Sequence, residues 1–132
     1  MNELRFDDRV AIVTGAGGNP SLGRAYARLL AARGAKVVVN DLGTGPDGQS
    51  KRRAAALDVV HEIREAGGEA IADRNSVADE AGAERIVETA LAKWGRVDIL
   101  INNAGMLVLK RFEEISSDEL RAIVDVHLMG TI

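Results

Sequence analysis

Short runs of β-branched residues alternate along the chain with longer segments in which apolar residues recur at helical spacing. The runs cover residues 10–13, 36–39 and 97–101, and a weaker one covers 69–73. Runs of this length that are apolar on both faces are typical of buried parallel strands, and the segments between them are long enough for crossover helices. The pattern therefore predicts an α/β fold with a doubly wound parallel sheet.

Start and stop signals delimit the first two expected helices. The first should begin between residues 21 and 24 and end at Arg33, with Gly34 as its stop. The second follows a long glycine-rich loop at 42–50 and stops at Gly67. Its apolar stripe consists of Ala55, Ala56, Val59, Val60 and Ile63.

Two further helices are predicted from capping signals. Ser76 with Asp79 resembles a capping box that opens a helix running through Trp94 to a stop at Gly95. Ser116 with Glu119 forms another, and the helix that it opens should point one apolar face inward. That face consists of Leu120, Ile123, Val124, His127 and Leu128.

The chain ends inside this last expected helix, so we expect a fold truncated after its fourth strand. The apolar segment 97–102 would then form an exposed sheet edge. Exposed apolar edges pair readily with other strands. We therefore expect self-association, or pairing with a complementary chain, through this edge, or else marginal stability.

Composition narrows the possible classes of function. The 132 residues are 46% hydrophobic and 28% charged, which predicts one globular domain covering 1–132. The net charge of -3 and the interspersed charges argue against nucleic acid as a partner, and no apolar run is long enough to span a membrane. Without cysteine, and with two histidines far apart in sequence, no metal site is expected and the cytoplasm is the expected location.

The segment VTGAGGNPSLGRAYA places a glycine-rich turn between the first strand and the first helix. This is the context of a Rossmann-type dinucleotide site. Gly15, Gly17 and Gly18 would let the backbone approach a pyrophosphate, Gly23 would let the helix pack closely on the sheet, and the amides at the helix start would favour the diphosphate. The alternative is a turn that needs glycine for its backbone dihedral angles alone.

Asp41 favours the dinucleotide interpretation. It ends the second strand, 18 positions after Gly23, near the offset at which a carboxylate accepts hydrogen bonds from the adenosine ribose. Its negative charge would repel a 2'-phosphate, so NAD is predicted in preference to NADP. Taken alone, Asp41 could be a surface residue that starts the next loop.

With RVDILINNAG at the fourth strand, the sequence resembles the short-chain dehydrogenase/reductase family along its whole length. The segments VVVNDLG, WGR, NNAG and VHLMG make it most similar to the (3R)-hydroxyacyl-CoA dehydrogenase domain of peroxisomal multifunctional enzymes and their bacterial relatives. The resemblance implies an NAD-dependent oxidoreductase that acts on 3-hydroxyacyl thioesters, or on hydroxysteroids and other secondary alcohols.

The resemblance also implies a role for each part of the site. The diphosphate would lie along Gly15, Ser21, Leu22 and Gly23, the adenosine ribose on Asp41 and Leu42, the adenine beside Asn75, Ser76 and Val77, and the nicotinamide ribose along Asn103, Ala104 and Gly105. In the family, the turn that contains Asn102 and Asn103 also ties the central strands together.

Three positions depart from the common family pattern. The glycine loop is two residues longer between Gly15 and Gly23, and Asn75 stands where the family usually has Asp. His127 occupies the position of the catalytic Asn, so it is a candidate catalytic residue. A lone His on an apolar helical face is, however, more often a packed core residue.

The resemblance implies that a Ser and a Tyr/Lys pair perform the proton transfer, and these residues would follow the last helix. The one tyrosine, Tyr26, has Leu30 four positions later and is expected to pack within the first helix. We therefore expect no turnover by this chain alone. Three hypotheses remain: part of an oxidoreductase, a non-catalytic nucleotide-binding or interaction module, and an inactive truncated relic.

Overall fold

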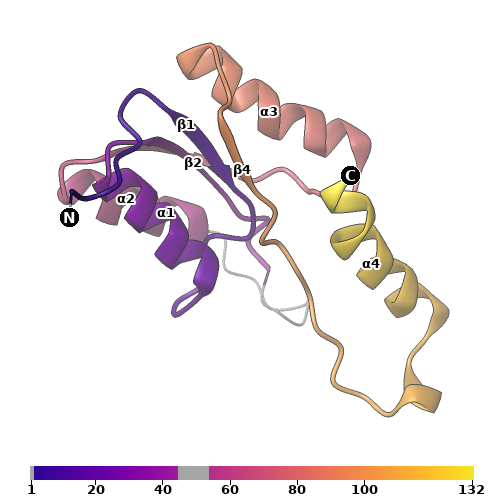
Figure 1. Ribbon diagram of the computed structural model, residues 1–132. Helices are drawn as coiled ribbons and strands as arrows, with labels where there is room; N and C mark the ends of the chain where they lie inside the picture. Colours follow the sequence, from indigo (N-terminus) through magenta and orange to yellow (C-terminus); the bar gives the residue numbers. More distant parts are fainter. Residues whose placement is uncertain (1, 45–53) are drawn as a thin grey trace.

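The computed structural model describes residues 2–44 and 54–132, so most of the glycine-rich loop expected at 42–50 lies outside the described residues. Strands and helices alternate along the chain (Figure 1). They are β1 (Val10–Val13), α1 (Leu22–Ala32), β2 (Lys36–Asn40), α2 (Ala55–Glu65), β3 (Glu69–Asp73), α3 (Glu80–Trp94), β4 (Ile99–Ile101) and α4 (Ser117–His127), with short 3-10 turns at Phe112–Glu114 and Met129–Thr131.

The four strands form one parallel sheet in the order β3-β2-β1-β4. Helices α1 and α2 cover one face of the sheet, and α3 covers the other (Figure 1). This arrangement confirms the predicted doubly wound α/β fold. The strand order reverses between β1 and β4, because β2 and β3 extend the sheet on one side of β1 and β4 lies on the other. Ligands bind at such a switch point in this class of sheet.

Alternate residues of the central strands pack into two separate apolar layers. Val13 and Val39 face α1 and α2, whereas Ile12 and Val38 face α3. All four side chains are fully buried. Because both faces of the sheet are covered, the strands appear in the sequence as continuous apolar runs rather than as alternating patterns.

The cap expected for α3 was wrong. The helix begins at Glu80, and its N-cap is Asp79, whose side chain accepts a hydrogen bond from the Gly82 amide. The Ser76 hydroxyl instead accepts from the Ala78 amide in a turn before the helix. Aspartate is as good an N-cap as serine, so both residues were plausible from sequence. The capping box of Ser116 and Glu119 on α4 is confirmed.

The inward-facing stripe expected for α4 was also wrong. No residue of this helix is buried, and Leu120, Val124 and Leu128 are 42–55% exposed. In Figure 1 the chain after β4 runs away from the sheet before it turns into α4, so the helix does not cover either face. Its apolar periodicity was real, but no element of the described structure packs over it.

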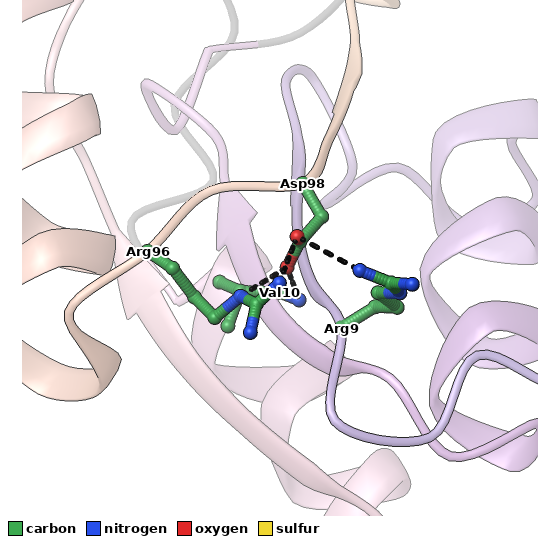
Figure 2. Close-up of polar contacts among 4 residues, drawn as sticks. All are labelled: Arg9, Val10, Arg96 and Asp98. Carbon is green, nitrogen blue, oxygen red and sulfur yellow. Dashed lines mark hydrogen bonds and ion pairs between the residues drawn. The ribbon is translucent and has the colours of Figure 1, made fainter.

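A carboxylate joins β1 to β4 where both strands begin (Figure 2). Asp98 accepts hydrogen bonds from the Val10 amide at 2.8 Å and from both Nε and Nη2 of Arg96, with Arg9 nearby. The guanidinium of Arg96 and the Val10 amide lower the pKa of Asp98 from its ordinary value of 3.8 to about 2. The regular strand starts at Ile99 rather than at residue 97. At Asp98 the backbone amide donates to the Val10 carbonyl, while the side chain accepts from the Val10 amide.

Candidate functional site

A cavity of about 560 Å³ lies at the carboxyl ends of the central strands. It is lined by the turn after β1, the end of β2, the turn after β3 and the turn after β4, together with Ala122 and Val126 of α4. Its volume lies within the range of small-molecule sites. Four segments that are far apart in sequence therefore meet at the switch point of the sheet.

The turn after β1 presents bare backbone to the turn after β4. A Cβ atom at Gly15 would lie 2.6 Å from the Cα of Ala104, and Gly15 has a φ of 62° that disfavours any other residue. Ser21 caps α1 by accepting from the Arg24 amide, and its hydroxyl donates to the carbonyl of Gly18. The residues that lead into α1, from Gly18 to Ser21, thus line the cavity.

Three residues expected at the diphosphate, Gly17, Leu22 and Gly23, do not line the cavity. Gly23 is buried beneath the turn, where a Cβ atom would lie 2.4 Å from Nδ2 of Asn103. Leu22 is 67% exposed on the outside of α1. The other residues predicted to hold the cofactor all line the cavity: Gly15, Ser21, Asp41, Leu42, Asn75, Ser76, Val77, Asn103, Ala104 and Gly105.

Asn103 ties β4 to β1 beside the cavity. Its side-chain amide donates to the carbonyls of Thr14 and Gly15, both at 3.0 Å, and its backbone amide donates to the Thr14 hydroxyl. Asn102 is exposed, with one long contact of 3.5 Å to the Thr131 carbonyl. Of the two asparagines considered for tying the strands together, Asn103 therefore makes the connection.

The carboxylate of Asp41 is held in the cavity wall by two backbone amides. Its Oδ2 accepts from Gly17 and its Oδ1 from Gly43, each at 2.8 Å, and the residue is only 7% exposed. A Cβ atom at Gly17 would lie 2.8 Å from this carboxylate, so the close approach requires glycine. Each oxygen retains capacity to accept from a ligand hydroxyl.

A second buried carboxylate, which the sequence analysis did not identify, lies behind the cavity. Asp73, at the end of β3, accepts from the side chain of Asn40, from both the backbone and side-chain amides of Asn75, and from the Thr89 hydroxyl. Asp73 and Asn40 read as ordinary strand-end residues. A polar residue ending each of two adjacent buried strands was the only available signal.

His127, at the end of α4, is not a core residue, so the packed-core interpretation was wrong. It is exposed, and its Nε2 lies 3.0 Å from the amide and 2.9 Å from the carbonyl of Met106. A Cβ atom on Gly105 would lie 2.7 Å from the ring. The ring thus lies against the backbone of a cavity-lining turn, although His127 itself does not line the cavity.

Tyr26 lies away from the cavity. It is 39% exposed on α1, and its expected packing role stays a prediction. Across residues 2–44 and 54–132, no three His, Cys, Asp or Glu side chains come together as metal ligands. Over the same residues, no helix has the length and apolar character to cross a membrane.

The chemistry of the cavity fits a dinucleotide. A helix start and bare glycine backbone are suited to a diphosphate, a fixed carboxylate to ribose hydroxyls, and a polar turn to a base. These features lie in separate segments around one cavity, as an extended ligand with chemically different parts requires.

Comparison with known proteins agrees with this geometry. Residues 9–132 match the short chain dehydrogenase family. The chain is 54% identical over 129 residues to the peroxisomal multifunctional enzyme type 2 of Drosophila melanogaster, which covers 98% of this chain and 21% of that protein. The chain thus spans about a fifth of the length of that curated relative.

Solved structures give the same result. A short chain dehydrogenase from Mycobacterium avium superposes with a TM-score of 0.81 at 47% identity, covering 94% of this chain and 42% of that one. A 7α-hydroxysteroid dehydrogenase in complex with NADH and 7-oxoglycochenodeoxycholic acid superposes with a TM-score of 0.81 at 34% identity, covering 96% and 45%.

Proposed function

The chain belongs to the short-chain dehydrogenase family, and on that premise we propose that it binds NAD as the cofactor-binding part of an oxidoreductase. The reaction would move a hydride between NAD and a secondary alcohol or ketone. The observation that carries the proposal is the buried Asp41 carboxylate in the wall of a cavity that also contains the glycine turn.

Each part of the cavity has a proposed part of NAD. Gly15 and Ser21 would hold the diphosphate, and Asp41 with Leu42 the adenosine ribose. The adenine would lie beside residues 75–77 and the nicotinamide ribose beside residues 103–105. Support comes from the lining of the cavity, where these segments follow one another around one space. When bound, the nicotinamide would supply the hydride acceptor.

The preference for NAD over NADP is tested by removing the charge of Asp41. Asp41→Asn keeps the size of the side chain but removes the repulsion of a 2'-phosphate. We expect the ratio of NADP affinity to NAD affinity to rise by about tenfold or more, measured by calorimetry. Asp58→Asn, an exposed residue of α2 that does not line the cavity, makes the same charge change and should leave the ratio unaltered.

The substrate proposed from the resemblance is a 3-hydroxyacyl thioester, with hydroxysteroids as the alternative that the bile-acid complex favours.

His127 is proposed as a catalytic residue because its ring lies against the turn at 105–106, next to the proposed nicotinamide end. With this chain alone we expect no NADH formation from either substrate. Tyr26, its one tyrosine, has Leu30 rather than Lys four positions later and lies away from the cavity.

A non-catalytic nucleotide-binding module is the second candidate, and these 132 residues, in which the one tyrosine has no Lys four positions later, support it equally well. The intact mass of the protein isolated from its source separates the two. A mass above that of 132 residues favours the oxidoreductase, whereas a matching mass with NAD binding favours the module.

The open edge of β4, where Leu100 is 54% exposed, is proposed to pair with a second copy or with a complementary chain.

The cytoplasm is the proposed location, and the peroxisome named in the Drosophila relative is its alternative. Fluorescence microscopy of the tagged protein distinguishes the two compartments.

A further inference from the structure

The side-chain amide of Asn75 lies between two charged groups that fix which end points where. Its Nδ2 donates to Oδ2 of Asp73 at 2.8 Å, and its Oδ1 accepts from Nε of Arg85 at 2.9 Å. A flip of the amide would place oxygen against the carboxylate and nitrogen against the guanidinium. Both ends therefore favour a single orientation.

Asp73 is held more firmly than Arg85, so it is the dominant partner. Asp73 is 6% exposed, and its other oxygen accepts from Nδ2 of Asn40 and from the Asn75 backbone amide, at 2.8 and 2.9 Å. Arg85 is an exposed side chain on the surface of α3. The nitrogen of Asn75 is thus drawn toward the protein interior, and its oxygen lies at the exposed end.

Asn75 lines the cavity, whereas Asp73 and Arg85 do not. We propose that Asp73 is a positioning residue for the base: by holding the nitrogen of Asn75, it leaves the carbonyl oxygen of Asn75 as the group presented to the ligand. An oxygen accepts a hydrogen bond from the exocyclic amino group of adenine and opposes the 6-oxo group of hypoxanthine. The site therefore selects adenine over hypoxanthine, an inference that rests on the proposed binding of NAD.

The test compares the affinities for NAD and for nicotinamide hypoxanthine dinucleotide, measured by calorimetry on the same protein. The unsubstituted chain should bind NAD about tenfold more tightly, because hypoxanthine would leave the acceptor of Asn75 opposite another acceptor. Asp73→Asn should reduce this preference to about twofold or less, since the new amide lets Asn75 flip. Asn75→Ala, which removes the acceptor, should reduce it as far.

Two matched variants separate positioning from general weakening of the fold. Arg85→Met should keep the preference, because Asp73 alone still holds the nitrogen. Thr89→Ala removes another hydrogen bond to the same oxygen of Asp73 and should keep it as well. The proposal is overturned if Asp73→Asn retains the tenfold preference, if Arg85→Met loses it as fully as Asp73→Asn, or if the unsubstituted chain prefers hypoxanthine.

The orientation itself can be measured without a ligand or a change at Asp73. Asn75 Nδ2 and the Thr89 hydroxyl both bond to Oδ2 of Asp73, so the Asn75 amide protons should show an NOE to the Thr89 methyl group. The NOE should persist in Arg85→Met, and its absence from the unsubstituted chain would overturn the proposal. A chain that shows the NOE but binds neither dinucleotide would contradict the proposed function and leave the positioning by Asp73 standing.

Discussion

Acid should destabilise the sheet by protonating Asp98, which joins β1 to β4 (Figure 2). Arg96 and the Val10 amide lower its pKa from 3.8 to about 2, so the folded chain binds this proton less readily than the unfolded chain. The stabilisation is complete above pH 4 and is lost as the pH falls through about 2.

Asp98→Asn should therefore be less stable than the unsubstituted chain at neutral pH, and the gap should close between about pH 4 and pH 2. Urea unfolding at a series of pH values, followed by the fluorescence of Trp94, measures this difference. Asp125→Asn changes an exposed residue of α4 and serves as the control. A gap that stays constant down to pH 2 would show that the charge of Asp98 does not stabilise the fold.

Gly15 has a positive φ and lies close to the backbone of Ala104, and each of these disfavours a side chain. Gly15→Ala would adopt a positive φ and would also press on the backbone of Ala104, whereas Gly67→Ala has a similar φ of 86° but open space around its Cβ atom. We expect Gly67→Ala to cost about 1 kcal/mol, and Gly15→Ala about 1–3 kcal/mol more. Equal losses in urea unfolding would mean that the close approach to Ala104 carries no energetic weight.

Residue types predicted most of the candidate site, because a glycine-rich turn after one strand and an aspartate at the end of the next strand together indicate a dinucleotide site. The partners of those residues could not be predicted. That Gly17 and Gly43 hold Asp41, and that Asp73 lies behind Asn75, depends on contacts across 24 positions of sequence or on turns with no distinctive composition. Sequence could not decide whether Asn102 or Asn103 ties β4 to β1, because the answer depends on the direction in which each side chain leaves the turn.

At the scale of elements, the strands and helices lie close to where the apolar pattern predicts them, and their bounds differ from the prediction mainly at the ends of elements. Sequence placed the start of α3 at Ser76, because serine and aspartate cap equally well; the structure places it after Asp79. Predictions failed for α4 because periodicity reveals an apolar face but not whether anything covers it.

The assignment of Asp79 as the N-cap of α3 can be tested by substitution. Asp79→Ala should destabilise the chain by about 1 kcal/mol, because the Gly82 amide loses its acceptor. Ser76→Ala should cost clearly less, since its hydroxyl accepts only within the preceding turn. Thermal unfolding followed by circular dichroism compares the two, and a larger loss for Ser76→Ala would reverse the assignment of the cap.

At the scale of the whole molecule, the sheet is covered on both faces but open along β4. Leu100→Lys places a charge on this edge strand and should reduce self-association, measured as mass against concentration by light scattering. Leu57→Lys makes the same change at a comparably exposed leucine on α2 and should have no effect. A monomeric unsubstituted chain at every concentration would contradict pairing through this edge.

Four segments that are distant in sequence surround one cavity, which is the proposed dinucleotide site. A titration of the ¹⁵N-labelled chain with NAD, followed by NMR, tests this proposal most directly. We expect amide shifts to change together in residues 15–21, 41–42, 75–77 and 103–105, and to stay constant around Gly67 in the groove between α1 and α2. No change on adding NAD, or changes confined to the groove around Gly67, would contradict the account.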